Sequence, residues 1–561
     1  MHRPNPFSSG TLQRVPSLIS RSPLRRIFPA VLLVLGLVAL SPTTRAVNPP
    51  PDGGYPGNNT AEGDNALFSL TTGQANTAIG FNALQSDTTG NFNTGIGKNA
   101  LFENTTGGGN TATGVEGLFS NTTGKSNTAN GVDALFKNTT GSNNTASGFS
   151  ALLANTTGSN NTANGRDALS NNTSGSFNTA NGNQALFNNK VGNGNTANGF
   201  QALFKNTASD NTATGVDALF KNTTGVQNTA NGANALGSNT TANSNTATGF
   251  NALFKNATGN LNTANGVEAL YSNTTGFGNT ATGFNALYSN TTSFGNTATG
   301  DSSLLNNTTG DANTADGAGA LANDTTGQQN TALGEDALGV NKTGNENTAI
   351  GQGALFNTTG SSNIALGKDA GQSLTTGDFN IDIGNEGGAG EAKTIRIGTV
   401  GTHTTTFIAG ISGAPVSGSI VVVNSTGKLG VATSSVRFKD AIKPMNKASE
   451  AILALKPVSF RYKEEIDPDG IPQFGLIAEE VEKVDPDLVG RDEDGKVNTV
   501  RYEAVNAMLL NEFLKEHGQV QQLKATVAQQ QKQIEALTAT VQKVSDQIAL
   551  SKPIPYFVAN P

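Results

Sequence analysis

The sequence predicts a mainly β protein, built as a long parallel β-solenoid of 17-residue repeats, then a small α+β domain and a C-terminal coiled coil. Three observations lead to this prediction. A regular repeat occupies residues 59–392, the composition becomes that of an ordinary mixed domain at Ser434, and apolar residues recur at heptad spacing from Val520 to Ile548. Such a fixed period of about 20 residues is typical of solenoids.

The composition excludes several classes of function. Among 561 residues there are 68 glycines, three histidines and no cysteine. The lack of cysteine excludes disulfides, thiolate zinc sites and a cysteine nucleophile, and His2, His403 and His517 lie too far apart in sequence to suggest a metal centre. A net charge of −7 argues against binding nucleic acid through a basic face. We therefore expect no metal, no cofactor and no nucleic-acid partner.

Residues 1–46 have the pattern of a secretory signal peptide. Arginines precede an apolar run at 27–40, and small residues around Ala46 follow it. The run is shorter than the about 20 residues that span a bilayer, although an uncleaved N-terminal anchor is the alternative. The mature chain would begin near Val47 with a Pro/Gly-rich leader over 47–58. We expect an exported protein, secreted or at the surface of a bacterium, with no membrane span after signal removal.

Each repeat reads N-T-A-x-G-x-x-A-L-x-x-N-T-T-G-x-x, and 20 copies begin between Asn59 and Asn380. Positions are counted from the first asparagine. The ninth position is leucine in 18 of the 20 copies, from Leu67 to Leu355. A disordered Asn/Thr/Gly-rich tract has no reason to keep one apolar phase over such a length, whereas a stacked solenoid adds one leucine per turn to a continuous core.

Seventeen residues suit one coil of two short strands and two turns. We expect the glycines at positions five and fifteen to supply corners with positive φ. The asparagines at positions one and twelve are expected to stack into hydrogen-bonded ladders. Whether one chain closes each coil or three chains share a core stays open. The leucine is lost at Gly371 and Gly388, which marks the end of the stack, and residues 393–433 have the pattern of a β-rich neck.

The phasing of the repeat loosely resembles the heads of trimeric autotransporter adhesins, in which short Gly/Ala/Asn repeats form stacked β-rolls. Those heads typically use a shorter repeat, and their outer-membrane barrel has no counterpart in this sequence.

Residues 434–517 predict a mixed domain. Its expected elements are a helix at 451–455, a strand at 458–463, a helix entered from Gly475, a hairpin turn at Asp494–Gly495 and a helix at 503–516.

Five short motifs in this domain resemble, in order, the C-terminal intramolecular chaperone domain of phage endosialidases and tailspikes. They are Ser434–Lys439, Leu455–Val458, Phe460–Tyr462, Gly475–Val481 and Pro486–Val489. The resemblance implies a domain that drives trimerisation of a β-rich fibre and then cuts itself off.

The same resemblance assigns roles to individual residues. It implies that Ser434 is the nucleophile, that Lys439 is its base and that the Thr433–Ser434 bond is cut. A Ser-Lys pair is a known variant of the catalytic triad, and desolvation in a closed trimer would favour the neutral lysine that it needs. Ser435 stands where the family has aspartate. Arg437 is read either as orienting a carboxylate or carbonyl or as a surface charge.

Residues 518–550 predict a coiled coil, followed by a tail at 551–561. The a and d positions alternate by threes and fours: Val520, Leu523, Val527, Gln530, Ile534, Leu537, Val541, Val544 and Ile548. Three strands fit the resemblance, although the sequence alone does not set their number; a lone amphipathic helix is the alternative.

These features together predict an exported, fibrous, homotrimeric surface protein whose C-terminal domain nucleates the trimer and cleaves itself once, as a single-turnover serine endopeptidase. Two alternatives stay open: a non-cleaving structural or adhesive fibre with a permanent C-terminal clamp, and a phage-derived receptor-binding fibre. A glycan or other surface ligand of the rod is not identified by any recurrent cluster of side chains.

Overall fold

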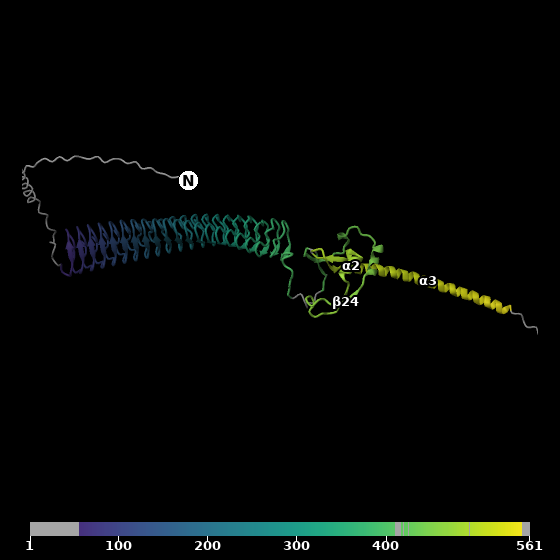
Figure 1. Ribbon diagram of the computed structural model, residues 1–561. Coiled ribbons are helices and arrows are strands. Elements are labelled where there is room, and N and C mark those ends of the chain that lie inside the picture. Colours follow the sequence, from purple (N-terminus) through teal and green to yellow (C-terminus); the bar gives the residue numbers. More distant parts are fainter. Residues whose placement is uncertain (1–54, 410–416, 419, 425, 493, 552–561) are drawn as a thin grey trace, which may run out of the picture. The chain divides into compact units, whose positions relative to one another are not determined.

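The computed structural model describes residues 55–409, 417–418, 420–424, 426–492 and 494–551 (Figure 1). The predicted signal peptide, 1–46, most of the leader and the tail after 551 lie outside the described residues. The chain divides after Thr399 into two units, and each is described by itself.

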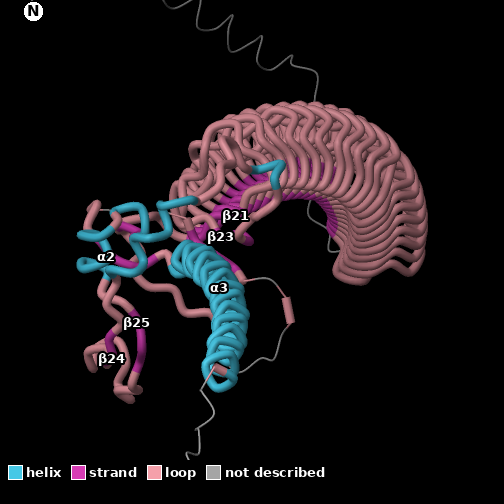
Figure 2. The backbone as a smooth tube through the Cα atoms, turned by 90° about the vertical axis from the view of Figure 1, so that its right-hand side faces the viewer, coloured by secondary structure: helices cyan, strands magenta, loops and turns pink. Residues whose placement is uncertain are grey.

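The first unit is a parallel β-solenoid, as the repeat predicts. Twenty-one short strands form one sheet in which each strand pairs in register with the next along the chain. Figure 2 shows the strands along the inner curve of the stack. They are β1 Thr60–Glu62, β2 Thr77–Ile79, β3 Thr94–Ile96, β4 Thr111–Thr113, β5 Thr128–Asn130, β6 Thr145–Ser147, β7 Thr162–Asn164, β8 Thr179–Asn181, β9 Thr196–Asn198, β10 Thr212–Thr214, β11 Thr229–Asn231, β12 Thr246–Thr248, β13 Thr263–Asn265, β14 Thr280–Thr282, β15 Thr297–Thr299, β16 Thr314–Asp316, β17 Thr331–Leu333, β18 Thr348–Ile350, β19 Ile364–Leu366, β20 Ile381–Ile383 and β21 Ile395–Ile397.

Each coil holds one strand, so the expectation of two strands per coil was wrong. The remainder of the coil is held by left-handed residues at positions seven, nine and seventeen, such as Asp133, Leu135 and Asn143 with φ of 57°, 55° and 60°. The backbone of such residues still bonds to the next coil: Leu135 N donates to Ala151 O at 2.9 Å. One chain closes every coil, which answers the question that the sequence left open.

The glycines at positions five and fifteen of the repeat have different structural roles. At position five the expected positive φ is confirmed, for example 137° at Gly165. At position fifteen it was wrong, because no such φ occurs there. Glycine relieves crowding at this position, because a Cβ on Gly158 would overlap the carbonyl oxygen of Gly175 and Oδ1 of Asn155. Ala242 and Ser293 show that a small side chain is accommodated in some copies.

The core of the solenoid is a column of alanine and leucine. The ninth-position leucines from Leu84 to Leu355 have no exposed surface, and the central alanine of nearly every strand is buried beside them. Each buried leucine contributes roughly 1.5–3 kcal/mol. Where Gly371 ends the leucine series, Leu374 fills the core from position twelve.

Both predicted asparagine ladders are present, and both are buried. At position one, Asn161 Nδ2 donates to Gly175 O at 2.8 Å and to Asn144 Oδ1 at 3.2 Å. At position twelve, Asn155 Nδ2 donates to Asn138 Oδ1 at 2.8 Å. Each amide therefore bonds along the stack, which offsets the cost of burying it.

The second unit has small antiparallel strand pairs and a long helix. Strands β22 Val421–Val423 and β23 Leu429–Val431 form one hairpin, β24 Val458–Phe460 pairs with β25 Gln473–Gly475, and β26 Val489–Arg491 pairs with β27 Val497–Val500. The helical elements are η1 Val436–Phe438, η2 Asn446–Ala454, α2 Ala478–Val484, η3 Pro486–Leu488 and α3 Tyr502–Leu550. The predicted neck is divided: β21 continues the solenoid sheet by pairing with β20, whereas β22 and β23 belong to the second unit.

Most predicted elements of this unit occur with altered limits. The helix expected at 451–455 is a 3₁₀ segment, η2, and the strand expected at 458–463 ends at Phe460. The helix expected at 503–516 and the coiled-coil segment are one continuous helix of 49 residues, α3. Met508 of α3 packs with Val481, Leu488, Val489 and Val500 in a small core.

The predicted heptad stripe lies on the surface of α3. Leu523, Ile534, Leu537 and Val541 are all more than half exposed in the single chain. A 49-residue helix with such a stripe is consistent with a coiled coil, because an isolated helix cannot bury its apolar stripe.

Two carboxylic acids replace asparagine in the position-twelve ladder, Asp87 and Asp324. Asp324 Oδ1 accepts from Asn341 Nδ2 at 2.9 Å, but Oδ2 is buried without a partner. Oδ2 lies where the other copies place an amide Nδ2, facing Gly327 O and Asn307 Oδ1. Burial raises the pKa of Asp324 to about 8 from the ordinary 3.8. The stack therefore favours the neutral acid, which can donate where the amide would.

We expect Asp324→Asn to stabilise the solenoid at alkaline pH. Because the folded-state pKa is raised, the stability associated with Asp324 is present below pH 3.8 and is lost as pH rises through about 8. The amide restores the missing donor, so the gain at pH 9 should be about 1–3 kcal/mol, and smaller at pH 5. Denaturant unfolding at both pH values measures it, with exposed Asp301→Asn as the control. A gain that is equal at both pH values would contradict this account.

Candidate functional site

A single 3₁₀ turn brings Ser434 and Lys439 together. In η1, Phe438 N donates to Ser435 O at 3.0 Å and Lys439 N donates to Val436 O at 3.1 Å. The turn folds the chain back, so that Lys439 Nζ lies 3.1 Å from Ser434 Oγ and donates to it. A nucleophile and its base need this hydrogen-bond distance.

The pair lies in the open in the single chain. Ser434, Lys439 and the neighbouring Val436 and Phe438 are all exposed. A lysine takes a proton only when it is neutral, and desolvation is what favours the neutral form. No other described part of this chain covers Lys439, so nothing in the single chain desolvates its amino group.

Arg437 and Ser435 are the two neighbours of the pair whose roles the sequence left open. The Arg437 guanidinium lies over the Phe438 ring, 4.7 Å from its centre, and not against a carboxylate. Ser435 is the residue before η1, and its side chain makes no capping hydrogen bond. Thr433, on the other side of the predicted scissile bond, is exposed.

A polar cluster that the sequence did not reveal joins η2 to α3. Ser449 is fully buried, and its Oγ donates to Glu512 Oε1 and accepts from Asn511 Nδ2 at 2.6 Å and from Lys515 Nζ at 3.2 Å. Lys515 Nζ also donates to Glu512 Oε1 at 2.6 Å. The hydrogen bond from Lys515, and to a smaller extent that from Ser449, lowers the pKa of Glu512. Only the spacing of Glu512 and Lys515 along one helix face gave any signal in the sequence.

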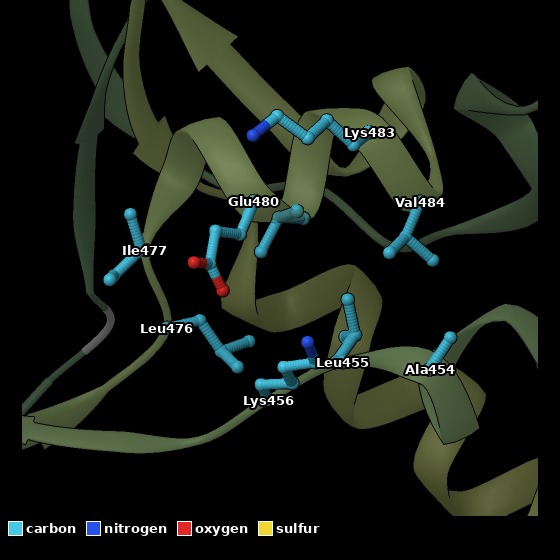
Figure 3. Close-up of a pocket in the computed structure, with 9 residues that line it drawn as sticks. Ala454, Leu455, Lys456, Leu476, Ile477, Glu480, Lys483 and Val484 are labelled. Carbon is cyan, nitrogen blue, oxygen red and sulfur yellow. The ribbon is translucent and has the colours of Figure 1, made fainter.

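Two of the family-like motifs line one pocket of about 280 Å³ (Figure 3). Leu455 and Lys456 come from the segment after η2, and Leu476 and Ile477 from the segment before α2. Glu480 points from α2 toward Leu476 and Lys456. These motif residues therefore line a pocket of the C-terminal domain, and they are distant in sequence from Ser434.

A solenoid followed by a small α+β unit and a long terminal helix defines a fibrous repeat protein with a C-terminal assembly domain. Residues 434–490 match the family described as chaperone of endosialidase, which confirms the resemblance that the motifs predicted. The match begins at Ser434 and supports a chaperone and trimerisation role on a fibrous protein; the family also suggests a self-cleaving, peptidase-like domain. No curated protein and no solved structure matches the chain significantly.

In the part of the chain that the structure describes, no helix is long and apolar enough to cross a membrane. No group of three or more His, Asp or Glu side chains there is arranged to hold a metal ion.

We expect Ser449→Ala to loosen α3 from η2. The change leaves Asn511, Glu512 and Lys515 each one partner short, and a lost buried hydrogen-bonding group costs about 1–3 kcal/mol. Amide hydrogen exchange in the first turns of α3 measures the loss, with exposed Ser459→Ala as the control. If protection of those turns is unchanged, the cluster does not fasten the helix.

The Ser449 cluster also makes folding stability depend on pH, in the opposite direction to Asp324. Because the pKa of Glu512 is lowered in the folded state, its stabilising contribution is present above pH 4.5 and is lost as pH falls through the folded-state value.

Proposed function

We propose that the chain is an exported, fibrous bacterial surface protein whose C-terminal domain nucleates a homotrimer and then releases itself by cutting the Thr433–Ser434 bond. The observation that carries the proposal is the 3.1 Å contact between Lys439 Nζ and Ser434 Oγ, at the first residue of the chaperone-family match.

The chemistry of the step follows from the position of the nucleophile beside the bond that it cuts. Neutral Lys439 takes the proton from Ser434 Oγ, which adds to the carbonyl carbon of Thr433. The C–N bond then breaks, and the proton is delivered to the amino nitrogen of Ser434. This leaves an ester between the Thr433 acyl group and Ser434 Oγ. Water hydrolyses the ester to a carboxylate on Thr433 and a free Ser434 hydroxyl, so that each chain turns over once.

Assembly is the trigger in this proposal. In the single chain the pair is exposed, and Val436 and Phe438 beside it are exposed apolar residues that a neighbouring chain can cover. Covering them would remove water from Lys439 and favour its neutral form. The unpartnered stripe of α3 supplies the association that brings the chains together.

One observation favours a second candidate, a fibre whose C-terminal domain stays attached as a clamp. Ser435 stands where the resembling family has aspartate. A trimeriser that has lost cleavage would keep the same fold and the same α3. A receptor-binding fibre of phage origin is not favoured by any feature of the described residues.

The cleavage proposal predicts two fragments. Residues 47–561 of the wild type should separate into 47–433 and 434–561, whereas Ser434→Ala and Lys439→Ala should stay intact because each removes one half of the pair. Denaturing gels and intact mass report the products. Ser435→Ala is the matched control and should still be cut between Thr433 and Ser434. An intact wild-type chain that is trimeric by native mass would leave the permanent clamp as the function.

The trigger proposal predicts that cleavage depends on the coil. A double change, Ile534→Asp with Leu537→Asp, places charge at adjacent a and d positions and should abolish both the trimer and cleavage. Lys532→Asp, on the same part of α3 outside the a and d positions, is the control and should preserve both. Native mass and the cleavage gel are read on the same samples. Full cleavage in a monomeric double variant would overturn assembly as the trigger.

A further inference from the structure

The outward face of the solenoid sheet is formed by two residues per strand. In the three-residue strands from β1 to β20 the middle residue faces the core, and the first and third point outward. In β21 all three residues are exposed. Since every strand is in register with the next, these outward residues make two parallel columns along the whole stack. We call this surface the strand face.

The strand face is nearly free of charge. It contains 42 outward positions, two for each of 21 strands, and only Glu62 and Asp316 are charged. From β4 to β15 every outward residue is threonine, asparagine or serine. Elsewhere in the coils charged side chains recur, for example at positions six and eleven, as in Lys98, Arg166 and Lys221. Depletion of charge is the compositional mark of a protein–protein interface core.

The strand face becomes apolar towards the C-terminal end of the solenoid. Its third residue is Leu333 in β17 and Ile350 in β18, and from β19 onward both outward residues are isoleucine or leucine. Several of these side chains are well exposed in the single chain: Ile364 43%, Leu366 46%, Ile395 65% and Ile397 71%. A contiguous exposed apolar patch of this kind marks a surface that is covered in the working protein.

We infer that the strand face, and above all its apolar end from Leu333 to Ile397, is where copies of this same chain pack against one another. Two features favour another copy over a different partner. The apolar patch lies at the end of the solenoid from which the chain continues to the chaperone-like segment, so association begun by that segment reaches this end first. The patch also continues into a nearly uncharged, repetitive surface along the rest of the stack, which an equally long and periodic partner matches best.

The apolar end also determines which coils of two neighbouring chains lie opposite each other. Between β4 and β15 a slip of one coil replaces threonine or asparagine by threonine or asparagine and changes little. A slip of one coil at the other end places Ile364 of β19 opposite Thr348 of β18. It also leaves one copy of the last rung, Ile395 and Ile397, without an apolar partner, so apolar surface stays in water. Packing of the apolar rungs therefore fixes which coils face each other before the repetitive rungs follow.

The chain lacks cysteine, so a single introduced thiol is a clean probe. Leu366→Cys places it on the strand face, and Phe379→Cys places it in the same copy of the repeat, off the strand and also exposed, at 60%. Both are made in the full chain carrying Ser434→Ala, so that the C-terminal domain stays attached. A bis-maleimide that spans about 10 Å matches the separation of sheets packed face to face.

This inference rests on the proposed homo-oligomer, and native mass on the same samples separates the two. We expect a multimeric assembly in which Leu366→Cys cross-links chain to chain with a several-fold higher yield than Phe379→Cys. A multimeric assembly in which the two yields are equal, or in which Phe379→Cys gives the higher yield, overturns the strand-face interface and leaves the proposed function standing. A monomeric chain overturns both. As a second variant, Ile364→Asp with Leu366→Asp should lower the cross-linking of Ile350→Cys, and Phe379→Asp should not.

Discussion

The structure depends on one constraint: every coil must present its carbonyl groups where the next coil can bond to them. The position-one asparagine enforces it, since its Oδ1 accepts from the backbone of the next coil while its Nδ2 donates to the carbonyl at position fifteen of its own coil. Two copies of only 16 residues show how firmly this holds. The first keeps only Thr207 of the Thr-Thr pair, and in the second Thr358 takes the buried place of the position-twelve asparagine. Even so, Asn211 N donates to Asn195 Oδ1 at 3.0 Å. The turn absorbs the deletion, and the ladder does not shift.

The same constraint explains which features the sequence could predict. A period of 17 residues with one leucine phase specifies a stack, and buried amides in a stack must bond to each other, so the solenoid and both ladders follow from composition and spacing. The left-handed backbone of Leu135 and its equivalents does not follow, because leucine seldom adopts that conformation and only the tertiary bonds to the next coil impose it. The single strand per coil is missed for the same reason.

At the candidate site the limits of prediction have a different origin. Ser434 and Lys439 are five residues apart, so a local turn brings them together and sequence alone could suggest the pair. Ser449 meets Glu512 and Lys515 from more than 60 residues away, and that contact exists only because η2 and α3 pack together. Exposure of the pair could not be foreseen either, since the resemblance concerns an assembled domain whereas the structure is that of one chain.

Repetition makes the rod easy to extend and hard to align. Each rung between β4 and β15 would offer a second chain nearly the same surface, so the free energy that separates one register from the next would be small there. A folded, non-repetitive C-terminal domain has only one register, and α3 has one heptad frame. If that domain sets the alignment and is then cut away, the aligned solenoids lose their fastest route of reassociation. Once separated, the rods would have to find register again without it. A cleaved fibre would then persist because its unfolding is slow, which is a kinetic form of stability. This would give the proposed self-cleavage a physical purpose in a protein built from nearly identical turns.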